Sequence, residues 1–75
     1  MRRVGEVVRT AQGLAVARCP DGDHPDLGTE VVTQDLATVG RVVDVFGPVD
    51  RPYVAVSPAE RTVLPDLLGE KLYAR

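Results

Sequence analysis

The stretch that decides the fold is VGRVVDVFGPVDRPYVAV, which runs from Val39 to Val56. Its first half predicts a strand, because β-branched residues fit a pleated sheet and lose side-chain freedom in a helix. Side chains along a strand alternate between two faces, so Val42 and Phe46 share one face. Val43 and Val45 share the other. We expect Val42 and Phe46 to fill the core and the second apolar face to stay uncovered, as a surface for a partner.

Glycine and proline mark where this strand bends and ends. Gly40 within a strand predicts a bulge, a barrel corner or a close approach of two backbones. Pro48 lacks the N–H group that a ladder needs, so the strand must end or bulge near Gly47. After a second turn at 50–52, the chain returns as a strand over 53–56.

The rest of the chain adds strand patterns separated by turns. The segments 4–10 and 14–19 flank a glycine-containing turn and predict a hairpin. Shorter strands are expected at 29–33 and 70–74. The segment 20–28 is dense in Pro, Gly and Asp, which predicts a loop.

A helix start is indicated at Ser57, which is followed by Pro58 and by Glu60 in the spacing of a capping box. Pro65 disfavours α-helical geometry at Leu64, so this helix is limited to a turn or two. Six short strands and at most one helical turn predict an all-β fold, a small six-stranded closed β-barrel that forms a single domain over 1–75. Closure also removes the strand edges that would pair with other molecules.

Composition argues against RNA binding by this chain alone. The formal net charge is −2, and the arginines are scattered along the sequence rather than clustered. Two tyrosines and one phenylalanine are the only aromatic residues, so platforms for base stacking are scarce.

Cys19 is the only cysteine, so no disulfide forms within one molecule. We interpret it as a small apolar residue near a strand end rather than a reactive thiol.

No apolar run approaches the ~20 residues of a membrane helix, and the N-terminus leads into a strand pattern rather than a signal peptide. We expect a soluble, cytoplasmic protein.

The loop at 20–28 carries the one cluster of potential metal ligands: Asp21, Asp23, His24 and Asp26. Oxygen-rich clusters bind divalent cations, but this spacing lacks the alternation and the late glutamate of a calcium loop. We therefore expect a solvated acidic loop and no metal.

Catalytic motifs are missing as well. No nucleophile sits beside a base, there is no GxxxxGK phosphate loop, and Asp44 and Asp50 are better explained by a strand face and a turn than as a carboxylate pair. We expect a binding module with no catalytic residue and no cofactor.

Three motifs in the opening stretch are more specific than generic barrel sequence: VGRV at 39–42, DVFGPV at 44–49 and PYV at 52–54. They resemble the Gar family, the small β-barrel subunit of box H/ACA ribonucleoproteins. Looser agreement at 4–5, 27–28 and 69–73 extends the resemblance over nearly the whole chain.

The resemblance implies a barrel of the type shared with translation-factor and reductase domains, and a non-catalytic role. Family members bind the pseudouridine synthase subunit and assist guide-RNA-directed rRNA pseudouridylation through substrate loading and product release, with the guide RNA involved only indirectly. This chain has no glycine-arginine-rich tail like those of eukaryotic relatives, so we expect the minimal archaeal form.

The partner contacts that the resemblance implies fall on Val43, Val45, Phe46, Gly47, Pro48, Val49, Pro52 and Tyr53. Alternation directs Val43, Val45, Pro48 and Tyr53 towards the partner.

Two alternatives stay open at this point. A free-standing OB-like or translation-factor-like nucleic-acid-binding barrel would bind single-stranded RNA with an affinity that weakens as salt is raised. A small enzyme or metal protein using the loop at 21–26 would retain a stoichiometric ion after dialysis.

Overall fold

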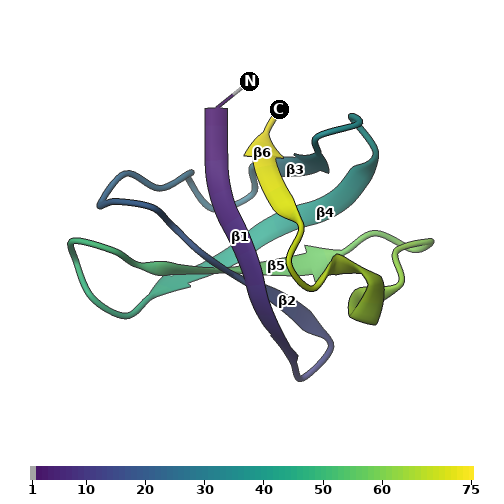
Figure 1. The fold of residues 1–75 in the computed structure, drawn as a ribbon, viewed down its shortest axis with the longest axis horizontal. Coiled ribbons are helices and arrows are strands. Elements are labelled where there is room, and N and C mark those ends of the chain that lie inside the picture. Colours follow the sequence, from purple (N-terminus) through teal and green to yellow (C-terminus); the bar gives the residue numbers. More distant parts are fainter. Residues whose placement is uncertain (1) are drawn as a thin grey trace.

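Residues 2–75, the part of the chain that the computed structural model describes, form six strands and one 3-10 turn (Figure 1). The strands are β1 (Arg2–Ala11), β2 (Leu14–Arg18), β3 (Glu30–Thr33), β4 (Thr38–Phe46), β5 (Tyr53–Pro58) and β6 (Lys71–Ala74), and the turn is η1 (Leu64–Leu67). Every pairing is antiparallel, and together the pairings close the barrel in the order β1-β2-β5-β4-β3-β6. The predicted all-β class and the closed six-stranded barrel are confirmed.

The hairpin predicted between the first two strands is present. Gln12 and Gly13 join β1 to β2 with φ values of 52° and 77°, the left-handed backbone that tight hairpin turns require. At its other end β1 pairs with β6, with Arg2 opposite Ala74, and this pairing closes the barrel.

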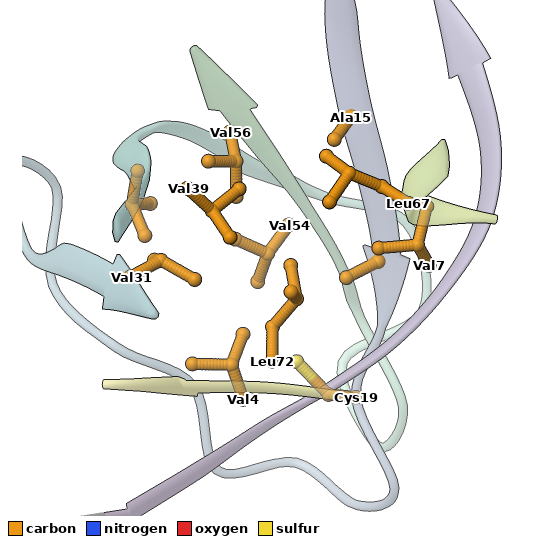
Figure 2. Close-up of a cluster of buried hydrophobic side chains, with 12 residues drawn as sticks. Val4, Val7, Ala15, Cys19, Val31, Val39, Val54, Val56, Leu67 and Leu72 are labelled. Atoms are coloured by element: carbon orange, nitrogen blue, oxygen red, sulfur yellow. The ribbon is translucent and has the colours of Figure 1, made fainter. Parts of the chain in front are cut away.

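Small branched side chains fill the barrel interior, where strands from both halves of the chain meet (Figure 2). The core cluster consists of Val4, Val7, Ala15, Ala17, Cys19, Val31, Val39, Val42, Val54, Val56, Leu67 and Leu72. Val42 therefore lies in the core, as its position in the strand predicts. Leu67 belongs to η1, which lies against β1 and β2 and adds an apolar side chain from outside the strands.

A β-bulge in β4 overturns part of the predicted alternation. Val42 pairs with Val56, whereas Asp44 pairs with Ala55, so Val43 is an extra residue without a partner on β5. Because one extra residue inverts the alternation beyond it, Val45 packs against the core and Phe46 lies outside with 37% of its surface exposed. Phe46 in the core and Val45 facing outwards were both wrong predictions, since a strict period of two was assumed through the bulge.

The predicted helix start at Ser57 is also wrong. Ser57 pairs with Arg41 and Pro58 with Gly40, so β5 continues through both residues and sheet pairing overrides the local capping signal. The helical turn forms later, at η1, with Pro65 in its first turn. Within residues 2–75, no helix is long and apolar enough to cross a membrane.

Gly40 marks a close approach of two backbones, which is one of the roles predicted for it. A Cβ atom at Gly40 would collide with the carbonyl oxygen of Ser57 and lie 3.0 Å from the Cα of Pro58. Backbone atoms on a paired strand have little room to move aside. The junction of β4 and β5 therefore depends on the missing side chain.

Gly40→Ala should destabilise the barrel by more than about 3 kcal/mol, because the strands must separate to admit a methyl group. Gly13→Ala is the matched comparison, since its Cβ would meet no atom within 4 Å and the cost is only that of its positive φ, about 1–2 kcal/mol. Urea unfolding of both variants measures the difference. An equal or smaller loss for Gly40→Ala would contradict this account of the junction.

Candidate partner-binding surface

A stacked aromatic pair forms the centre of an outer surface at the end of the β4–β5 hairpin. Phe46 and Tyr53 are directly paired across the two strands, with ring centroids 5.5 Å apart and an interplanar angle of 20°. Gly47, with φ +89°, brings its backbone against the Tyr53 ring, where a Cβ would lie 2.8 Å from Cδ2 of Tyr53. The aromatic pair is thus held in one arrangement by backbone contact as well as by stacking.

The loop that follows presents further apolar surface. Val49 is 91% exposed, and Pro48 next to it is also exposed. The loop is closed by a hydrogen bond from the Arg51 N–H to the Pro48 carbonyl (3.2 Å) and tied to β2 by one from the Cys19 N–H to the Pro52 carbonyl (2.9 Å). A shallow pocket of about 230 Å³ lies beneath the loop and extends to the acidic loop at 20–28.

The eight residues expected to contact a partner divide into two groups in the structure. Five are exposed and available for contact, namely Val43, Phe46, Gly47, Pro48 and Val49. Tyr53 is half-buried by its neighbours on the outer face, whereas Val45 is half-buried against the core and Pro52 is buried. Val45 and Pro52 thus support the surface from within, and Tyr53 and four of the exposed residues can form it. The fifth, Val43, lies further along β4, in a hollow that Gly40 and Ser57 also line.

Two arginines missed by the sequence analysis complete this surface. The Cζ atoms of Arg18 and Arg9 lie 5.1 and 5.8 Å from the centroid of the Tyr53 ring, within the range of cation–π attraction. Arg18 is the direct cross-strand neighbour of Tyr53. The sequence predicts the hairpin that joins β1 to β2. It does not predict the pairing of β2 with β5, which brings both arginines to Tyr53.

The whole chain, residues 1–75, matches the sequence model of a family described as "Gar1/Naf1 RNA binding region". This chain belongs to the Gar1/Naf1 family. An uncharacterized protein of the archaeon Methanothermobacter thermautotrophicus is 39% identical over 78 residues, covering 97% of this chain and 82% of that protein. The resemblance to the Gar family is therefore confirmed.

The fold is shared with a solved member of the family. The structure described as the Gar1 domain of NAf1 superposes with a TM-score of 0.77, covering 97% of this chain and 79% of that one. Only 18% of the residues are identical, so this likeness shows that the barrel fold is kept while most side chains differ.

The acidic loop folds around hydrogen bonds of its own. The Asp23 N–H donates to Oδ1 of Asp21 (2.9 Å), and Arg2 bridges the loop by contacting Oδ1 of Asp23 (3.6 Å) and donating to the His24 carbonyl (2.9 Å). Nδ1 of His24 lies 3.1 Å from the Pro25 carbonyl. Across the described residues, no three His, Cys, Asp or Glu side chains are grouped in a way that could hold a metal ion.

Cys19 lies in the core, in agreement with its interpretation as a small apolar residue. Burial raises the pKa of its thiol above the ordinary value, and the negative charges of Asp21 and Asp23 raise it further. A higher pKa leaves less thiolate at neutral pH, and the thiolate is the reactive form. Burial and a raised pKa both argue against a reactive thiol at Cys19.

The bulge predicts an unusual order of stabilities for two neighbouring substitutions. Val45→Ser should destabilise the barrel by about 2 kcal/mol, because it removes apolar packing against the core and buries a hydroxyl group. Phe46→Ser should cost only about 1 kcal/mol, mainly the lost stacking on Tyr53, although more atoms are removed. Urea unfolding of the two variants gives the comparison. A larger loss of stability for Phe46→Ser would contradict the bulge and indicate that Phe46 lies in the core.

Stability should fall with rising pH in a way that depends on Cys19. Its pKa is raised in the folded state, so the folded thiol stays protonated while the unfolded thiol ionises above about pH 8.5. The contribution of Cys19 to the free energy of unfolding is constant below that pH and decreases above it, by up to about 1.4 kcal/mol per pH unit. Urea unfolding between pH 7 and 10 should show a shallower decline in Cys19→Ala, and identical slopes would refute the raised pKa.

Proposed function

We propose that this chain is a non-catalytic, cytoplasmic subunit of a box H/ACA ribonucleoprotein. In that particle it binds the pseudouridine synthase subunit and assists guide-RNA-directed rRNA pseudouridylation, by aiding substrate loading and product release. Membership of the Gar1/Naf1 family supports this proposal. The guide RNA is involved only indirectly.

The observation that carries the proposal is the exposed aromatic and apolar surface at the end of the β4–β5 hairpin. Phe46 lies on the outside of the barrel, stacked on Tyr53 and followed by a loop whose Val49 is almost fully exposed. Aromatic side chains held in a fixed arrangement lose little entropy on binding and often dominate the affinity of an interface. Their exposure in an isolated barrel is explained if a protein partner covers them.

The arrangement suits binding rather than chemistry. The loop carries no acid–base pair, and the nearby Asp44 carboxylate accepts a hydrogen bond from the N–H of Val45 (2.9 Å), which fixes it within the bulge region. What the surface offers a partner is apolar area from Phe46, Pro48 and Val49, bordered by the arginines that contact Tyr53.

The purified chain, mixed with an archaeal H/ACA pseudouridine synthase, should form a stoichiometric complex on gel filtration. Phe46→Glu should weaken this complex at least about 30-fold, because a charge replaces an aromatic contact worth about 2 kcal/mol or more. Val63→Glu is the matched control. Val63 is also an exposed apolar residue (58%), but it lies beyond β5, at the end of the barrel away from the hairpin loop.

Circular dichroism should show that both variants keep the barrel. The proposal fails if no complex forms at salt concentrations where both proteins are folded. It also fails if Phe46→Glu and Val63→Glu bind equally well. Salt-sensitive binding of labelled single-stranded RNA by the isolated chain, without binding of the synthase, would instead favour the free-standing nucleic-acid-binding barrel.

A further inference from the structure

Three arginines that are far apart in the sequence line one small pocket beside the aromatic surface. Arg3 comes from β1, Arg18 from the end of β2, and Arg51 from the loop between β4 and β5. The pocket has a volume of about 140 Å³, and its remaining lining residues are Gly5, Glu6, Val8 and Pro20.

Two of these guanidinium groups are held in place by contacts that leave their charge unneutralised. Nε of Arg51 donates to the Cys19 carbonyl (3.1 Å), which leaves the two terminal nitrogens free of hydrogen bonds to other described residues. The guanidinium of Arg18 lies over the Tyr53 ring, 5.1 Å from its centroid. Neither arginine therefore needs to be immobilised when a ligand arrives.

The positive charge of the pocket is not balanced from within. Among residues 2–75, ion pairs join Arg2 to Asp23 and Arg75 to Glu30, and neither pair lies at this pocket. Glu6 is the only carboxylate in the lining, and although it is opposite Arg18 in the β1–β2 register, the two form no ion pair. Three cations thus face one anion.

Arg18 also has an unsatisfied donor. Its Nε atom is buried and has no hydrogen-bond acceptor within the described part of the chain. A buried donor on a charged group is normally paired, because it loses its hydration without compensation otherwise. The Arg18 side chain is therefore left with one donor unpaired.

We propose that this pocket binds a phosphate group. Guanidinium groups present planar sets of donors that match the oxygens of phosphate and often bind it through two parallel hydrogen bonds. The three arginines that line the pocket offer more donors than the two oxygens of one carboxylate can accept, which favours a tetrahedral phosphate over an acidic side chain. The phosphate belongs either to the backbone of a nucleic acid or to a free phosphate compound.

This site goes beyond the proposed function and does not depend on it. With a net charge of −2, the chain does not attract a polyanion over its whole surface. The pocket instead supplies one local contact, which would add to binding in an assembly without giving the isolated chain strong affinity. The substitutions that test the pocket leave Phe46 in place, so a failure to bind phosphate and a failure to bind the synthase are distinguishable.

The direct test follows the Nε–H signals of Arg18 and Arg51 by NMR while ¹⁵N-labelled protein is titrated with inorganic phosphate at constant ionic strength. We expect saturable shifts in both signals. Arg51→Gln should weaken the apparent affinity at least about tenfold, whereas Arg61→Gln should leave it unchanged. Arg61 is the matched control, since it is exposed, lies outside the pocket and loses the same charge.

Arg18→Lys provides a second variant in case Arg51→Gln disturbs the contact with Cys19. It keeps the charge but removes the Nε donor and the planar fork, so phosphate should bind more weakly while the barrel signals are retained.

A second titration uses a short single-stranded RNA without terminal phosphates. If the RNA shifts the same signals and inorganic phosphate competes with it, the natural ligand is a nucleic-acid backbone. If only inorganic phosphate binds, the ligand is a free phosphate compound. The proposal is overturned if the shifts are unsaturable or are equal in Arg51→Gln and Arg61→Gln. It is overturned as well if a glutamate-rich peptide binds and phosphate does not displace it.

Discussion

Closure of this barrel depends on close backbone contacts at two glycines. A Cβ at Gly5 would collide with the carbonyl of Arg18, and one at Gly40 with the carbonyl of Ser57. These contacts fix the β1–β2 and β4–β5 junctions, so that the two hairpins can pair through β2 and β5. The interior that results is narrow, which explains why valine and alanine fill most of it. Without the two close approaches, neither the core nor the outer face would be assembled.

The outer face combines two kinds of chemistry on adjacent strands. The stacked aromatic pair lies across β4 and β5, and the three arginines of the pocket lie beside it on β1, β2 and the hairpin loop. Tyr53 and Arg18 connect the two, because each contacts the other across the β2–β5 pairing. A protein that covers the aromatic pair would thus lie next to the arginine pocket. The fold places a hydrophobic contact and a cationic contact within reach of one assembly.

The strands were predictable because their signals are local. Short apolar or valine-rich runs between glycine and proline turns located the six strands, and the turn at Gln12 and Gly13 located the first hairpin. Ser57 misled the prediction, since its capping pattern is also local but sheet pairing with Arg41 is the stronger interaction. The arginine pocket was not predictable from spacing, because Arg3, Arg18 and Arg51 meet only once the barrel has closed. The family motif located the candidate partner-binding stretch but not which of its side chains point outwards.

The bulge at Val43 has a consequence for how this surface can change during evolution. The alternation of inner and outer side chains before Val43 is out of phase with the alternation after it. The extra residue in β4, rather than side-chain chemistry, therefore determines that Phe46 is outside. Substitutions that keep the length of β4 can vary the outer residues one at a time. Deletion of the unpaired Val43 would remove the bulge and leave Val45 inside and Phe46 outside, whereas regular pairing of β4 at its present length would exchange the inner and outer sets. We therefore expect a relative without this bulge to have one residue fewer between the positions of Val42 and Val45.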